Sequence, residues 1–169
     1  MSASEPLVGI VMGSDSDLPI VAKAAEVLKK FGVSYSMNII SAHRSPNKAH
    51  DFASNADKNG MKVLICAAGK AAHLAGVMAA YTVLPVIGLP TKSSTLDGLD
   101  SLLSVVQMPN GIPVATVAID GAVNAALLAI QILAVGDSEL KEQLIQYKAD
   151  MAEEVEIKDA KLKKEFDNE

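Results

Sequence analysis

The segment from Ser41 to Pro46 places a histidine and an arginine directly in front of a predicted helix start. The imidazole of His43 could move a proton between bound groups. Arg44 could hold a phosphate through two parallel hydrogen bonds, and the amino end of a helix also attracts anions. Ser45 can cap that helix, and Pro46 suits its first turn. The segment indicates a phosphorylated substrate and proton transfer; a surface loop with solvated charges is the alternative.

A second polar segment, Gly13 to Asp17, follows an apolar run. The hydroxyls of Ser14 and Ser16 and the free N–H groups of the next helix could hold a phosphate. Asp17 could accept hydrogen bonds from ribose hydroxyls, as acidic residues do in nucleotide-binding folds. The segment has neither the glycine spacing of dinucleotide-binding proteins nor the Gly-Lys-Ser/Thr of a P-loop. A simple helix cap at Ser16 or Asp17 is the alternative.

The third segment of interest runs from Ala68 to His73. The small residues Ala68, Gly69 and Ala71 let a ligand approach the backbone, whose N–H groups could receive a carboxylate. His73 falls in the first turn of an apolar helix predicted from Ala71. It is either a second group of the site or a histidine satisfied within the core.

Other kinds of chemistry have weaker support. No His/Cys/Asp cluster has the spacing of a zinc site. Cys66 lies within a predicted strand, where we expect it to be buried, and His50 is expected on a helix surface. A Ser-His-Asp hydrolase built from Ser14 or Ser16 with His43 ranks low because the G-x-S-x-G elbow is absent.

The elements that must position these segments alternate along the chain. Short apolar runs predict strands, and segments of helical period predict helices. The expected strands are 7–12, 34–40, 63–67, 85–89 and 114–119. A first helix is expected to begin after a cap at residues 16–17, and further helices are expected at about 46–59, 71–81, 99–107 and 124–135. This alternation predicts an α/β fold with a doubly wound parallel sheet. Because such sheets bind ligands at the carboxyl ends of their strands, we expect the three polar segments to converge.

Length and composition fit one domain with a large aliphatic core. The chain has 169 residues, half of them hydrophobic, with no Trp. A net charge of −5 argues against nucleic-acid binding. Cys66 is the only cysteine, residues 1–6 have no signal-peptide pattern, and no apolar run reaches the length of a membrane span. We therefore expect a cytoplasmic protein without a disulfide and without contact to a membrane.

The composition changes after Ser138. Charged residues alternate with Leu140, Leu144, Ile145 and Met151, which predicts an amphipathic helix. We expect residues 1–157 to form a single domain that includes this helix, and residues 158–169 to form a charged, flexible tail.

Four segments taken together resemble the signatures of the class I PurE family, the N5-carboxyaminoimidazole ribonucleotide mutases of purine biosynthesis. These segments are Gly13 to Asp17, Ser41 to Arg44, Ala71 to Leu74 and the Pro/Gly-punctuated loop Gln107 to Pro113. The likeness extends from about Leu7 to Met151. Each segment alone is a modest signal, whereas four in order at this spacing are highly specific.

The resemblance implies a fold, a reaction and an assembly. The fold would be a flavodoxin-like three-layer αβα sandwich with a central parallel sheet. The reaction moves a carboxylate from the exocyclic nitrogen of a phosphorylated aminoimidazole ribonucleotide to its ring carbon C4, without a metal, ATP or an organic cofactor. The assembly would be a homo-octamer with active sites at the junctions between subunits.

The resemblance also implies a role for each matching residue. His43 would be the main acid and base, with His73 in support. Asp17 would bind the ribose hydroxyls. The 5′-phosphate would be held by Ser14, Ser16, Ser41 and Arg44, and the migrating carboxylate would lie against Ala68, Gly69 and Ala71.

The chain departs from the family pattern at two positions. Lys70 stands where the family usually has Gly, and Ala75 stands where it usually has Pro. Lys70 could strengthen the capture of the carboxylate or of CO2, could point away, or could block the loop. Two alternatives therefore stay open: a carboxylase that acts on aminoimidazole ribonucleotide with free CO2, and a nucleotide-binding homologue whose catalysis is impaired by Lys70.

Overall fold

The computed structural model describes residues 5–94 and 96–166. Residues 1–4, 95 and 167–169, which include parts of the predicted N-terminal segment, of the loop before Leu99 and of the predicted tail, lie outside the described residues. The chain divides into two compact units, one up to Leu133 and one from Ala134 onward.

The first unit is built on a five-stranded parallel sheet with the strand order β2-β1-β3-β4-β5. The strands are β1 Val8–Met12, β2 Tyr35–Ile39, β3 Val63–Ala68, β4 Val86–Pro90 and β5 Ala115–Thr116. This order is that of flavodoxin-like folds. Every residue of β1, β3 and β4 is buried, as expected where helices cover both faces of a parallel sheet. The predicted three-layer αβα sandwich is confirmed.

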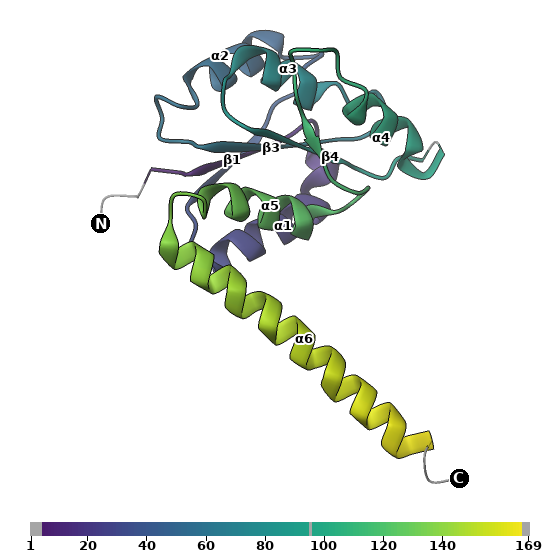
Figure 1. The fold of residues 1–169 in the computed structure, drawn as a ribbon. Helices are drawn as coiled ribbons and strands as arrows, with labels where there is room; N and C mark the ends of the chain where they lie inside the picture. Colours follow the sequence, from purple (N-terminus) through teal and green to yellow (C-terminus); the bar gives the residue numbers. More distant parts are fainter. Residues whose placement is uncertain (1–4, 95, 167–169) are drawn as a thin grey trace. The chain divides into compact units, whose positions relative to one another are not determined.

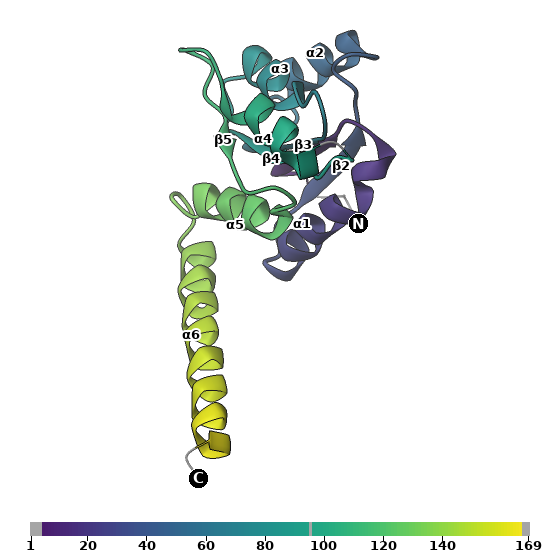
Figure 2. The same cartoon turned by 90° about the vertical axis from the view of Figure 1, so that its right-hand side faces the viewer.

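Helices cover the two faces of this sheet (Figures 1 and 2). They are α1 Leu18–Lys30, α2 Pro46–Asn55, α3 Leu74–Tyr81, α4 Leu99–Val106 and α5 Ala122–Leu133, with short 3-10 helices η1 Asp15–Asp17 and η2 Leu96–Gly98. Helices α1 and α5 pack together on one face, and α2, α3 and α4 lie on the other. At Gly88 in β4 a Cβ atom would lie 2.3 Å from Val105 Cγ1 of α4, so glycine is required for this close packing.

Several element boundaries differ from the predicted ones. Strand β5 has two residues instead of six expected over 114–119, because the next bond of its ladder would need a backbone N–H from Pro90, which proline lacks. Helix α2 ends at Asn55 and helix α3 begins at Leu74, later than the expected Ala71.

The buried face of α1 also differs slightly from the predicted one. From the helical spacing of Ile20, Ala24, Val27 and Phe31 we expect these residues on the inward face, but Ile20 and Val27 are only partly buried, and Val21 and Leu28 are fully buried in their place. Ala24 is buried as expected.

The second unit consists mainly of one long helix, α6 Ser138–Phe166. Asp137 caps it, since its Oδ1 accepts hydrogen bonds from the backbone N–H groups of Glu139 and Leu140. We expected regular structure to end near Ile157, but the helix continues to Phe166. The reason lies in its charges: the pairs Glu154–Lys158 and Asp159–Lys163 have the helix-stabilising spacing and order, acid before base.

In the part of the chain that the structure describes, no helix has both the length and the apolar character that crossing a bilayer requires.

Candidate active site

A cavity of about 590 Å³ lies at the carboxyl ends of β1 to β4, a size suited to a small-molecule ligand. Its lining comes from four loops: Gly13, Ser14, Ser16 and Asp17; Ser41, Ala42, His43 and Arg44; Ala68, Gly69, Lys70 and Ala71, with Leu74; and Thr91, Lys92, Ser93 and Ser94. The predicted convergence of three polar segments is confirmed. The fourth loop, after β4, was not predicted.

The loop after β1 is held by a capping box. Ser14 Oγ accepts a hydrogen bond from the backbone N–H of Ser16, and the Asp17 carboxylate accepts one from the backbone N–H of Ser14. Ser14 therefore caps the 3-10 turn η1, which the sequence did not predict, whereas Asp17 is the N-cap residue of α1, one of the two predicted, although its side chain makes no capping bond to that helix. Both serines also line the cavity.

Asp17 is the buried acidic group of the cavity. Its Oδ1 accepts a hydrogen bond of 3.0 Å from the hydroxyl of Thr91. Burial raises the pKa of the Asp17 carboxyl, and the hydrogen bonds from Thr91 and from the Ser14 backbone oppose that rise. A buried carboxylate that lines a ligand cavity is a suitable acceptor for ribose hydroxyls.

The loop after β2 is stabilised by serines. Ser45 Oγ accepts from the Ser41 backbone N–H and donates to the Ser41 carbonyl, so Ser45 does not cap α2 through its side chain as predicted. Ser41 Oγ accepts from the backbone N–H of Arg44 at 3.2 Å. These bonds fix the backbone from which His43 and Arg44 reach the cavity.

The two histidines of the predicted site lie against each other. His43 Nε2 and His73 Nδ1 are 3.0 Å apart, with the ring planes at 84°. Such a contact needs a proton on one of the two facing nitrogens and none on the other. His73 is the N-cap residue of α3, so its backbone is positioned by that helix. Through the contact of 3.0 Å its ring orients the ring of His43. A cavity-lining imidazole oriented by a second one is a suitable general acid and base.

The loop after β3 brings its backbone close to the cavity. A Cβ atom at Gly69 would lie 2.8 Å from Thr91 Oγ1, so only glycine fits there without displacement. Lys70 is exposed and adopts a left-handed backbone conformation, with φ at 56°. This conformation is strained for a residue with a Cβ and costs roughly 1–2 kcal/mol.

Cations outnumber acidic groups around the cavity. Arg44, Lys70 and Lys92 line it together with the single carboxylate of Asp17. Lys92 forms an ion pair of 3.2 Å with Asp97, while its backbone N–H donates to Asp120 Oδ1. The excess of positive charge favours an anionic ligand although the chain as a whole is acidic.

Sequence reasoning missed the loop after β4, residues 91–94. Its signal was available, because the rule that ligands bind at the carboxyl ends of parallel strands applies to the fourth strand as well. A polar run, Thr91 to Ser94, directly follows that strand.

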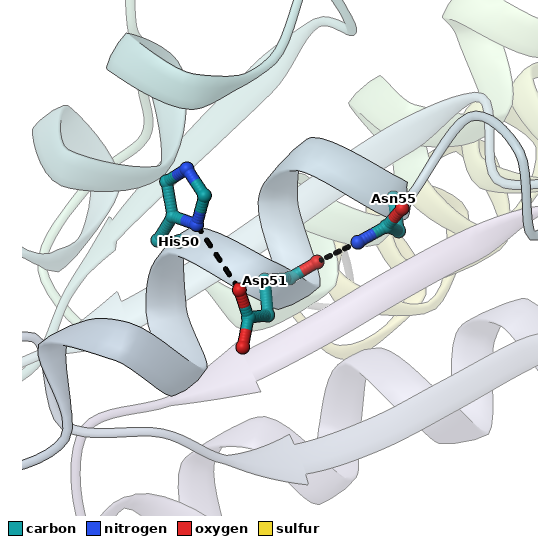
Figure 3. Close-up of polar contacts among 3 residues, drawn as sticks. All are labelled: His50, Asp51 and Asn55. Carbon is teal, nitrogen blue, oxygen red and sulfur yellow. Dashed lines mark hydrogen bonds and ion pairs between the residues drawn. The ribbon is translucent and has the colours of Figure 1, made fainter.

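Two other residues lie outside the cavity lining, as expected. His50 is exposed on α2, where its Nδ1 lies 3.1 Å from Asp51 Oδ1 (Figure 3). Its ring also makes an edge contact with Tyr81. Cys66 is buried in β3, and burial raises the pKa of its thiol to about 12. At that pKa the thiolate, the reactive form, is scarce at neutral pH.

The loop Gln107 to Pro113 does not line the cavity of its own chain. Met108 packs near Gly76 of α3, and most of the loop is exposed. Across residues 5–94 and 96–166, no three His, Cys, Asp or Glu side chains come together as a metal site would require.

Comparison with known proteins agrees with this geometry. The model of the AIR carboxylase family matches residues 7–154. The chain is 58% identical over 162 residues to the N5-carboxyaminoimidazole ribonucleotide mutase of Pyrococcus horikoshii, covering 96% of this chain and 92% of that protein. It is also 58% identical over 150 residues to the phosphoribosylaminoimidazole carboxylase of Candida albicans, but it spans only 26% of that longer protein.

Among solved structures, Treponema denticola PurE superposes with a TM-score of 0.85 at 32% identity, covering 94% of this chain and 99% of that one. A five-stranded sheet in flavodoxin order, a cavity built from the loops after its strands, and a family match over most of its length agree with one another. The chain belongs to the AIR carboxylase family, PurE.

Proposed function

We propose that this chain is an N5-carboxyaminoimidazole ribonucleotide mutase of purine biosynthesis. It converts its substrate to 4-carboxyaminoimidazole ribonucleotide, an isomerisation in which the carboxyl group moves from nitrogen to carbon. The observation that carries this proposal is the contact of 3.0 Å between His43 and His73 at a cavity rich in phosphate-binding groups. The mutase of Pyrococcus horikoshii, 58% identical over nearly the full length of both chains, supports the same reaction.

Each loop of the cavity binds a different part of the substrate. Arg44 and the hydroxyls of the first two loops hold the 5′-phosphate, and Asp17 accepts hydrogen bonds from the ribose hydroxyls. The backbone from Ala68 to Ala71 surrounds the migrating carboxylate, and the Lys70 ammonium lies beside it. The phosphate-holding hydroxyls belong to Ser14, Ser16 and Ser41.

His43 acts twice in the reaction. It first gives a proton to the exocyclic nitrogen, so that the N–C bond to the carboxyl group breaks and CO2 is released within the cavity. The ring carbon C4 then attacks that CO2 and forms the new C–C bond. His43 takes the proton that C4 loses, which restores the aromatic ring and returns His43 to its starting state. Holding both fragments in one cavity replaces a bimolecular encounter with a local one.

The enzyme is proposed to act as a homo-octamer in the cytoplasm. Exposed apolar side chains on α4 support self-association: Leu99, Leu103 and Val106 are each about half exposed. The loop Gln107 to Pro113 follows this helix directly and is available to reach the cavity of a neighbouring subunit.

The test compares two identical substitutions. His43→Asn removes the acid and base, and we expect it to abolish turnover while binding of the substrate is largely retained. His50→Asn makes the same change at an exposed histidine outside the cavity and should leave turnover at the parent level. Retained turnover in His43→Asn, or equal losses in both variants, contradicts the role of His43.

A further inference from the structure

Thr91 is a polar residue held rigidly at the end of β4. It is 1% exposed. Its backbone N–H donates to the carbonyl of Ala68 at 2.9 Å, and its carbonyl accepts from Ser101 Oγ at 2.8 Å. The backbone of Thr91 is therefore tied both to β3 and to α4.

The Thr91 hydroxyl lies between two other loops of the cavity. It donates to Asp17 Oδ1 at 3.0 Å, although the two residues are 74 positions apart in the chain. On its other side it lies against Gly69, where a Cβ atom would come within 2.8 Å of it. The packing thus fixes where the hydroxyl is, and the hydroxyl fixes one oxygen of Asp17.

The second oxygen of Asp17 is also held, by the backbone N–H of Ser14 at 3.3 Å. An ionised carboxylate has about four lone-pair sites, so these two bonds leave capacity for two more. Asp17 lines the cavity, and the adjacent hydroxyls of a ribose offer two donors. The carboxylate is preorganised to accept both.

We propose that Thr91 is a positioning residue for substrate binding, and that its hydroxyl orients the Asp17 carboxylate toward the ribose hydroxyls of the nucleotide. This inference rests on the proposed function, in which Asp17 contacts the ribose. Thr91 acts through Asp17 and takes no part in proton transfer, so its loss affects affinity and not the chemical step.

The effect of the Thr91 hydroxyl on Asp17 should depend on pH, because of the charges around Asp17. Burial raises the pKa of Asp17 most, and the Thr91 hydroxyl bond is the main effect that lowers it. Without that hydroxyl the carboxyl group would protonate at a higher pH and lose acceptor capacity. Other groups face the same region: Asp15 and Asp120 raise the pKa further, and His43, Arg44, Lys70 and Lys92 line the cavity from the other loops.

The test uses Thr91→Val, which removes the hydroxyl and keeps the shape, with Thr91→Ser as the matched variant that retains it. We expect Thr91→Val to raise KM about tenfold, the loss of one hydrogen bond to a charged group, with kcat close to the parent value. The rise should grow as the pH is lowered. Thr91→Ser should restore KM toward the parent value at every pH.

Two further measurements make the result decisive. In an Asp17→Asn background, Thr91→Val should add little to KM, because Thr91 acts through Asp17. Thermal unfolding shows whether Thr91→Val is folded; if it is not, Thr91→Ala is assayed in its place. Equal KM values for the Val or Ala variant and for Thr91→Ser, or a loss confined to kcat, would overturn the inference.

Failure of the proposed function looks different. In that case the parent protein does not convert the substrate, or Asp17→Asn leaves its KM unchanged. If parent and Asp17→Asn behave as proposed and Thr91→Val still matches the parent, the role of Thr91 alone is wrong.

Discussion

Neighbouring residues of this site have separate tasks. His43 contacts His73 and is suited to move protons, whereas Arg44 follows it directly and is suited to bind phosphate. Ser41 beside them accepts a hydrogen bond from the Arg44 backbone N–H and also lines the cavity, whereas Ser45 bonds within the loop. The chemical step and the affinity for substrate should therefore respond to different substitutions.

Arg44→Ala is expected to raise KM by roughly tenfold to a hundredfold and to change kcat little, because it removes charge-assisted hydrogen bonds to the phosphate. Lys48→Ala is the matched control: Lys48 is an exposed cation on α2 whose Nζ bonds to the Ile39 carbonyl outside the cavity lining. Steady-state kinetics of both variants gives the answer. Similar KM values for the two would refute phosphate binding by Arg44.

Asp17 should lower the stability of the fold as it ionises. Its pKa in the folded protein lies above the usual 3.8 because of burial, so its favourable contribution is complete below that value and is lost as pH rises through the folded pKa. Asp17→Asn cannot ionise. Its free energy of unfolding should therefore increase relative to the parent between about pH 3 and about pH 7.

Denaturant unfolding at the two pH values measures this difference. Asp51→Asn, at an exposed carboxylate, is the control and should show little change with pH. A relative stability of Asp17→Asn that falls with rising pH would mean that burial of Asp17 is not the dominant effect.

At the scale of elements, much of the fold could be predicted because its signals are local. Buried strands such as β1 and β3 are continuous apolar runs, and their order along the chain predicts the layers. What failed depends on contacts between distant residues. The length of β5 is limited by Pro90 of another strand, and Thr91 joins the site only because β4 places it beside Asp17.

Caps were the other source of error, since neighbouring serines compete for the same role. Ser14 caps the short turn before α1, and Ser45 is the N-cap residue of α2 as predicted, but its hydroxyl bonds to Ser41 and not to the α2 backbone. Helix α6 continues past Ile157, where the pairs Glu154–Lys158 and Asp159–Lys163 have the spacing that supports a helix.

Two substitutions at Lys70, in the loop after β3, can separate the effect of backbone strain from the effect of charge. The free energy of unfolding of Lys70→Gly should be about 1 kcal/mol higher than that of Lys70→Ala, because only glycine adopts the φ of 56° without strain. Both variants lose the ammonium group that the proposed function places beside the migrating carboxylate, so both should show a similar rise in KM. Denaturant unfolding and kinetics on the pair separate the two effects.

The result for Lys70 has a clear contrary outcome. Equal stability of the two variants would remove the claim of strain. A gain of activity in Lys70→Gly would mean that Lys70 obstructs the loop.

At the scale of the whole molecule, the proposed octamer depends on apolar surface that a monomer would leave in water. Leu103 is 49% exposed and lies between Leu99 and Val106, the other exposed apolar side chains named on α4. We expect Leu103→Glu to lower the molar mass measured by light scattering below that of an octamer, because it would place a charge in the proposed interface. Val83→Glu, at a valine that is 97% exposed and lies outside α4, should leave the mass unchanged. A monomeric parent protein would contradict the assembly itself.

The central claim is that the carboxyl group moves within one bound molecule. The most direct measurement supplies N5-carboxyaminoimidazole ribonucleotide with ¹³C in its carboxyl group, together with excess unlabelled bicarbonate. We expect the product to keep the label at its C4 carboxyl group and to form at a rate independent of bicarbonate. Product with an unlabelled carboxyl group, or product formed only from aminoimidazole ribonucleotide and bicarbonate, would contradict it.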